Sequence, residues 1–236
     1  MLEFFSTLHW GAVLQIIVID ILLGGDNAVV IALACRNLPK ELRTRGVLLG
    51  TLGAIALRIA LISFAVLLLD IPFLKFTGGL MLLWIGVKLM MPEHSDPNIK
   101  ATDQLWAAIK TIIVADAVMS VDNVIAVAGA AEAADPQHRL ALVIFGLLVS
   151  IPLIVWGSTL VLKLLDKFPI VIALGAGLLG WIAGGLMIDD PFLDRWPTTN
   201  LLGVEYTARV AGAVLVLACG WYFRRRVQAV EAKAAH

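Results

Sequence analysis

The stretch that decides the fold is IVIDILLGGDNAVV, at residues 17–30. It is apolar enough to lie inside a membrane, yet it holds two carboxylates and one amide. Much the same pattern returns as IVADAVMSVDNVI at residues 113–125. The polar residues that recur, each 96 positions later, are Asp20, Asp26 and Asn27 in the first stretch and Asp116, Asp122 and Asn123 in the second. Because an ionisable group costs about 2.5–3.5 kcal/mol at the centre of a membrane helix, a repeated set of them indicates function.

The composition predicts an all-α polytopic membrane protein. Of the 236 residues, 60% are hydrophobic and 15% are charged, and the mean hydropathy is +0.93. Soluble domains hold about 45–50% apolar and about 25% charged residues. The formal net charge is zero, and we expect the lipid bilayer rather than a nucleic acid as the large partner.

Seven apolar stretches are long enough to cross a hydrocarbon core, which takes about 20 residues of helix. The predicted spans are 10–34, 46–69, 73–90, 105–131, 140–162, 170–187 and 204–223.

Basic residues fall unevenly on the two faces of such a membrane protein. With alternating loops, 13 lysines and arginines lie on one side, and only Lys75, Arg139 and Arg195 lie on the other. Basic loops stay on the cytoplasmic side. This bias predicts a bacterial-type inner membrane protein with its N-terminus outside and its C-terminus in the cytoplasm.

The repeat continues beyond the polar motif, since Gly50 matches Gly146 at the same offset and Trp84 matches Trp181 after one inserted residue. Each unit holds three spans, so the second unit enters the membrane from the opposite face. This is an inverted-topology repeat, whose binding site is expected at the membrane midplane between the units. The predicted division is a first three-helix repeat at 1–90, a cytoplasmic linker at 91–103, a second inverted repeat at 104–187, and an outer loop, seventh helix and basic cytoplasmic tail at 188–236.

Depth and helical register predict how the polar residues are placed. Asp20 and Asp116 fall near the middle of their spans, as a central pair of carboxylates with one aspartate–asparagine pair on each side. Residues seven apart share a helix face, so Asp20 should look the same way as Asn27. Asp26 could converge on the same ion if the helix unwinds at Gly24-Gly25, because glycine tolerates irregular backbone.

The residue types predict a cation site. Carboxylate and amide oxygens suit Mg²⁺, Ca²⁺ or Mn²⁺ rather than zinc or copper. Ser120 and Met119 lie on the face of Asp116 and are weaker candidate ligands. Arg58 has no counterpart in the second unit, where Ile154 takes its place. We expect Arg58 to be a structural counter-charge to one of the aspartates, with gating or coupling as the alternative.

At Gly24-Gly25-Asp26-Asn27 and Ser120-Val121-Asp122-Asn123 the sequence resembles the TerC family of integral membrane proteins, in the broader group that includes the lysine-exporter superfamily. The resemblance covers nearly the whole chain. It implies export of divalent metal, chiefly manganese, from the cytoplasm.

We therefore expect a secondary transporter for which Mn²⁺ or another divalent cation is the substrate and no cofactor is permanently bound. No nucleotide-binding Gly-x-x-x-x-Gly-Lys-Ser/Thr motif is present, so exchange for protons is the expected driving reaction. An enzyme is not expected, because the intramembrane-protease pattern Gly-x-Gly-Asp would need a glycine where Leu23 stands. The alternatives are an amino-acid exporter of the lysine-exporter type and a membrane scaffold that supplies metal to exported enzymes. The residues leave open the identity of the divalent ion, the number of ions bound, the coupling ion and the oligomeric state.

Overall fold

The computed structural model describes residues 10–63, 71–91, 100–134, 139–193 and 202–234. This part of the chain is helical and contains no strand, which confirms the predicted fold class. Its helices are α2 (Trp10–Cys35), α3 (Lys40–Ser63), α5 (Leu74–Met90), α6 (Ala101–Ala134), α7 (Arg139–Lys167), α8 (Ile170–Ile188) and α9 (Leu202–Ala234).

A helix lies on each of the seven predicted spans, and several extend beyond them. α3 begins at Lys40 instead of residue 46, and α9 ends at Ala234 instead of residue 223. Residues 64–69 of the second predicted span lie outside the described residues. Five segments of the described chain are long and apolar enough to cross a membrane, and Gly25–Cys35 is a shorter apolar helix. The chain is therefore an integral, multi-pass membrane protein.

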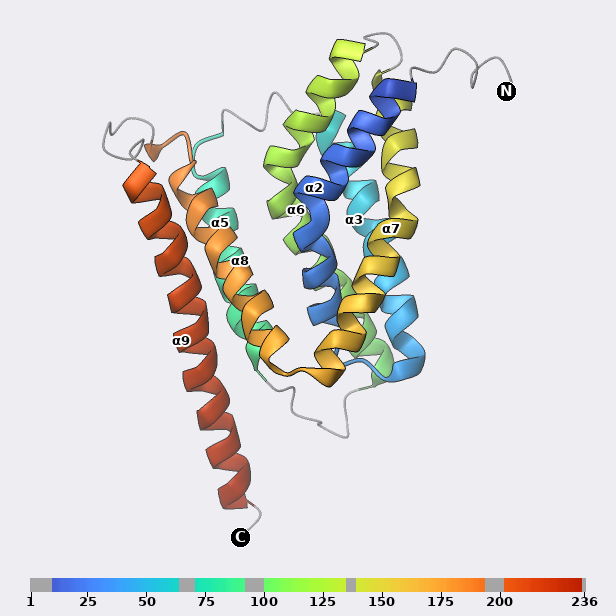
Figure 1. The fold of residues 1–236 in the computed structure, drawn as a ribbon. Coiled ribbons are helices and arrows are strands. Elements are labelled where there is room, and N and C mark those ends of the chain that lie inside the picture. The colour runs from blue at the N-terminus through green and yellow to red at the C-terminus, as the bar shows by residue number, and fades with distance from the viewer. Residues whose placement is uncertain (1–9, 64–70, 92–99, 135–138, 194–201, 235–236) are drawn as a thin grey trace.

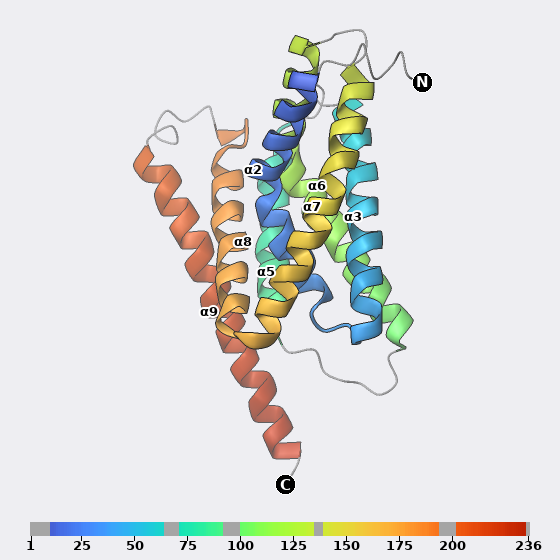
Figure 2. The same cartoon turned by 45° about the vertical axis from the view of Figure 1, so that its right-hand side comes forward.

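The helices form two groups that stand side by side (Figure 1). α2, α3, α6 and α7 make one group, while α5 and α8 pair in the other and α9 covers the outer side of α8 (Figure 2). The first helix of each set of three packs on the second helix of the other set: α2 packs on α7, and α6 packs on α3. Matched helices such as α2 and α6 run in opposite directions. The division into two inverted units with a linker remains a prediction.

Burial follows the membrane setting. Small and branched apolar residues such as Ala32, Leu82 and Ala183 fill the interior, with at most 1% of their surface exposed. Large apolar side chains face outward instead, and Trp84 and Trp156 are 63% and 68% exposed. A soluble protein rarely presents this much apolar surface, whereas lipid covers it in a membrane.

α8 and α9 approach each other through glycines. A Cβ on Gly184 would lie 2.2 Å from the carbonyl oxygen of Ala208, and a Cβ on Gly212 would lie 2.1 Å from that of Gly180. Only glycine permits this distance between the two backbones. Small residues at such contacts are typical of helix association in membranes.

Asp190, just after the end of α8, is hydrogen-bonded to the start of α5. α5 starts after Phe73, which has a left-handed φ of 65°. The Asp190 carboxylate accepts hydrogen bonds from the backbone N–H groups of Phe73 and Phe76, both at 3.0 Å, and of Phe192 at 2.9 Å. Burial opposes ionisation of this group, but these backbone donors outweigh it and lower the pKa of Asp190. The carboxylate therefore caps α5 from a segment more than 100 residues away in the sequence.

Candidate functional site

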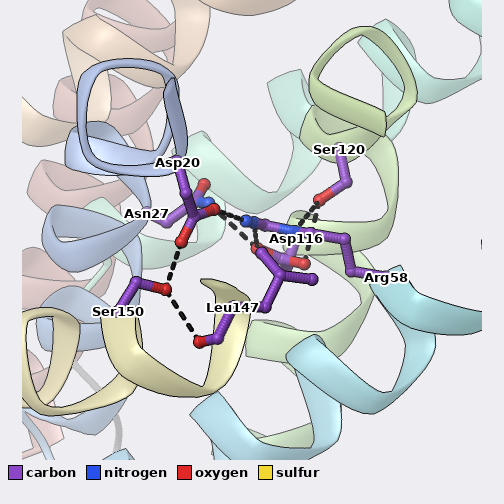
Figure 3. Close-up of polar contacts among 7 residues, drawn as sticks. All are labelled: Asp20, Asn27, Arg58, Asp116, Ser120, Leu147 and Ser150. Carbon is purple, nitrogen blue, oxygen red and sulfur yellow. Dashed lines mark hydrogen bonds and ion pairs between the residues drawn. The ribbon is translucent and has the colours of Figure 1, made fainter. Parts of the chain in front are cut away.

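A buried polar centre lies where α2, α3, α6 and α7 meet (Figure 3). α2 supplies Asp20, α3 supplies Arg58 and α6 supplies Asp116. These three charged residues are 1%, 2% and 7% exposed. Charges this deeply buried are retained only where they are paired and hydrogen-bonded.

Arg58 connects the two aspartates. Its Nη1 donates to Asp20 Oδ1 and its Nη2 to Asp116 Oδ1, and both contacts are ion pairs. Its Nε donates to Ser120 Oγ at 3.0 Å. The planar guanidinium thus uses all three of its nitrogens, a geometry that a lysine ammonium cannot reproduce. Arg58 thus pairs with both aspartates, whereas one partner was expected.

Neutral side chains make further hydrogen bonds to the two carboxylates. Ser120 Oγ donates to Asp116 Oδ2 at 3.0 Å. Asn27 Nδ2 donates to Asp116 Oδ1 at 2.9 Å, from the opposite helix. The Ser150 hydroxyl lies against Asp20 Oδ2 and against the carbonyl of Leu147, 2.8 Å away, so these two acceptors share its single proton.

The contact between Asn27 and Asp116 corrects the predicted depth pattern. We expected Asp20 to face Asp116 directly, with Asn27 in a separate pair below them. Asn27 instead joins the central pair, because its amide donates to Asp116. The guanidinium of Arg58 bridges the two central carboxylates.

The local unwinding that would bring Asp26 to the same ion is not present in α2, because the helix is continuous through Gly24-Gly25. A membrane offers unpaired backbone groups no water, so the helix is the state that satisfies them. Asp20 and Asn27 therefore share a face, and Asp26 lies beside it. Asp26 is half-buried, and its Oδ1 has no hydrogen-bond partner among the described residues. The same is true of Asn27 Oδ1.

Three candidates from the sequence remain, Met119, Asp122 and Asn123. Met119 is buried among the apolar side chains of the main core, a position that favours packing over metal ligation. Asn123 is also buried, at 7% exposed. The side chain of Asp122 lies outside the described part of the structure. Where side chains are described, no three His, Cys, Asp or Glu residues gather closely enough to hold a metal.

Ser150 was missed at the sequence level. It lies in an apolar run of α7, and nothing in that run distinguishes it from Ser158. Ser158 is equally buried, but its hydroxyl donates to the Ile154 carbonyl of its own helix at 2.7 Å. Only the packing of α7 against α2 shows which of these two serines meets a carboxylate.

The centre presents four carboxylate oxygens and one amide oxygen around one guanidinium. Two carboxylates and one guanidinium leave the group with a net charge of −1 when both acids are ionised. Hard oxygen donors with excess negative charge suit a divalent cation. In the structure the guanidinium stands between the carboxylates, so a cation at that position must replace it.

A multi-pass helical protein with a charged centre buried between its helices is a transporter-like membrane protein. Residues 5–228 match the integral membrane protein TerC family, and the chain belongs to that family.

Its relatives include three bacterial proteins. The uncharacterized membrane protein YjbE of Bacillus subtilis is 48% identical over 179 residues, which cover 76% of this chain and 80% of YjbE. The uncharacterized membrane protein YceF of the same organism is 26% identical over 68% of this chain and 64% of its own length. The UPF0053 protein YegH of Escherichia coli is 26% identical over 76% of this chain but only 37% of its own length. No solved structure matches the chain.

Proposed function

We propose that the chain is a secondary transporter that exports a divalent cation, with manganese as the preferred substrate, and that it is not an enzyme. The observation that carries this proposal is the pair of buried aspartates, Asp20 and Asp116, contributed by equivalent helices of the two predicted repeats. Asn27 and Ser120 extend the oxygen-rich surface around them. Membership of the TerC family supports membrane transport, while manganese is our choice among the hard divalent ions.

The direction of transport and the coupling are also part of the proposal. The excess of basic residues on one face supports an inner-membrane location with the N-terminus outside and the C-terminus in the cytoplasm. Arg58 supplies one positive charge against two carboxylates. A proton supplies the missing charge when the divalent cation leaves, so we propose exchange for protons.

An amino-acid exporter fits the centre less well. A zwitterionic substrate needs a cation for its carboxylate, and Arg58 is the only basic residue that the described centre offers. Both outer nitrogens of Arg58 are already bound to aspartates. A scaffold that supplies metal to exported enzymes would need a bound metal but no flux, and measuring flux separates it from a transporter.

Total cellular metal tests the proposal in cells that lack their own manganese exporters and grow under manganese stress. The informative variant is Asp116→Asn, which keeps the shape of the side chain and removes its charge. Asp103→Asn is the matched control, because Asp103 is an exposed aspartate in the first turn of the same helix. Membrane levels of the three proteins are matched before metal is measured.

We expect the intact chain and Asp103→Asn to lower cellular manganese, and Asp116→Asn to leave it at the level of cells without the protein. Manganese that is unchanged by the intact chain would refute export of this metal. Loss of an amino acid from the same cells would favour the lysine-exporter alternative. A flux of manganese that ignores an imposed pH gradient would refute the proton exchange alone.

A further inference from the structure

The polar centre is asymmetric at one position. Asp20 and Asp116 occupy equivalent places in the two repeats, but the counterpart of Arg58 is Ile154, a buried apolar residue. One guanidinium therefore serves two carboxylates from different halves of the molecule. An ion pair that served only stability would need one arginine and one aspartate. It would not need an arginine that contacts an aspartate from each repeat.

We propose that Arg58 is a tethered competitor of the transported cation: its guanidinium fills the cation position between Asp20 and Asp116, and the divalent cation binds there only when the guanidinium withdraws. This inference rests on the proposed function. Arg58 is a positioning residue in this scheme, because it acts on the cation through the two carboxylates.

Geometry and charge both require an exchange instead of joint occupancy. Each central carboxylate gives one oxygen to Arg58, and the second oxygens accept from Ser150 and Ser120. A cation that enters must take oxygens that the guanidinium now holds. It would also stand beside a buried positive charge, where repulsion is screened far less than in water.

The competitor lowers the apparent affinity without changing the ligands. When a binding-competent state is only fractionally populated, the apparent Kd rises by the inverse of that fraction. If the guanidinium occupies the position about nine-tenths of the time, its removal tightens binding about tenfold. The same competition favours net release, because the guanidinium returns to the vacated position and keeps the cation from rebinding.

The first test measures Mn²⁺ binding to purified protein in lipid nanodiscs, from the loss of the free-ion electron paramagnetic resonance signal. Arg58→Gln removes the charge and keeps hydrogen-bonding atoms. Arg209→Gln is the matched control, since Arg209 pairs with Glu205 at 2.7 Å on α9, outside the polar centre. We expect Arg58→Gln to bind Mn²⁺ about tenfold more tightly than the intact chain, while Arg209→Gln binds with the affinity of the intact chain.

A second measurement uses the intact chain and holds even if Arg58→Gln does not fold. Infrared difference spectra are recorded with and without Mn²⁺, on protein carrying ¹³C in the guanidinium carbon of arginine. Withdrawal of the guanidinium gives a difference band that shifts with the label. The band should be absent in Arg58→Lys, which identifies Arg58 as its source.

The outcomes separate this inference from the function on which it rests. Mn²⁺ binding to the intact chain without a label-sensitive band means that the guanidinium stays in place, and the inference falls while cation binding stands. Equal or weaker binding by folded Arg58→Gln also overturns it. If the intact chain binds no Mn²⁺, the proposed function and this inference both fail.

Discussion

In the polar centre, a small number of hydrogen bonds stabilises each buried charge. Breaking a buried ion pair by removing one partner costs about 3–5 kcal/mol, because the other charge stays buried without compensation. Neutral partners contribute less, but leaving a buried acceptor without its donor still costs about 1–3 kcal/mol. The two serines of α7 separate this contribution from the general effect of removing a hydroxyl.

Ser150→Ala should lower the free energy of unfolding by about 1–3 kcal/mol, because Asp20 Oδ2 loses its hydroxyl donor. Ser158→Ala is the control, with an equally buried hydroxyl that bonds only its own helix. Thermal unfolding of the two purified variants in the same detergent measures the difference. Equal melting temperatures would show that the contact between Ser150 and Asp20 contributes nothing to stability.

The sequence could predict those residues whose charge is energetically costly inside a membrane span. Asp20, Asp116 and Arg58 are charges in apolar spans, so a partner for each was expected from the membrane setting alone. That Arg58 pairs with both aspartates, and that Asn27 reaches Asp116, depends on the register of four helices. Ser150 carries no charge, and a hydroxyl in a membrane helix can always bond its own backbone.

At the scale of helices, α5 depends on a cap from a distant segment. Because its pKa is lower in the folded protein than the ordinary value of 3.8, Asp190 contributes stability fully above that value. The contribution is lost as the pH falls through the lower folded pKa. Asp190→Asn leaves one acceptor oxygen where three backbone donors converge, and should cost about 0.5–2 kcal/mol at pH 7.

Melting temperatures of the intact chain and of Asp190→Asn, taken from pH 7 down to pH 3, check this expectation. The gap between the two proteins should narrow on acidification. A gap that stays constant or widens below pH 4 would contradict the cap assigned to the ionised carboxylate.

The close contact between α8 and α9 leads to a second prediction, which concerns helix packing. Gly184→Ala places a methyl group 2.2 Å from the Ala208 carbonyl oxygen, so the helices must separate, at a cost of about 1–3 kcal/mol. Gly203→Ala is the control, because a Cβ there meets nothing within 4 Å. In thermal unfolding, the melting temperature should fall for Gly184→Ala and stay unchanged for Gly203→Ala. Only the structure shows that α9 packs against this glycine-rich face of α8.

For the whole molecule, hydropathy predicted the class and the approximate position of each helix in the described residues, since apolar length is a strong signal in a membrane protein. The arrangement of the helices could not be predicted in this way, because hydropathy does not show which helices pack against each other.

A C-terminal green fluorescent protein fusion should fluoresce and a C-terminal alkaline phosphatase fusion should be inactive, if the basic end of α9 is cytoplasmic. The opposite pair of results would reverse the proposed orientation and the direction of export.

The most direct test of the account is manganese flux through the purified protein. The intact chain and its Asp116→Asn and Asp103→Asn variants are reconstituted into liposomes that contain a manganese-sensitive dye, and Mn²⁺ is added outside. The account predicts dye quenching with the intact chain and Asp103→Asn, at a rate that an imposed pH gradient changes, and at least a tenfold slower rate with Asp116→Asn. Quenching no faster than in empty liposomes, or equal rates in all three proteins, would contradict a manganese transporter built on the buried carboxylates.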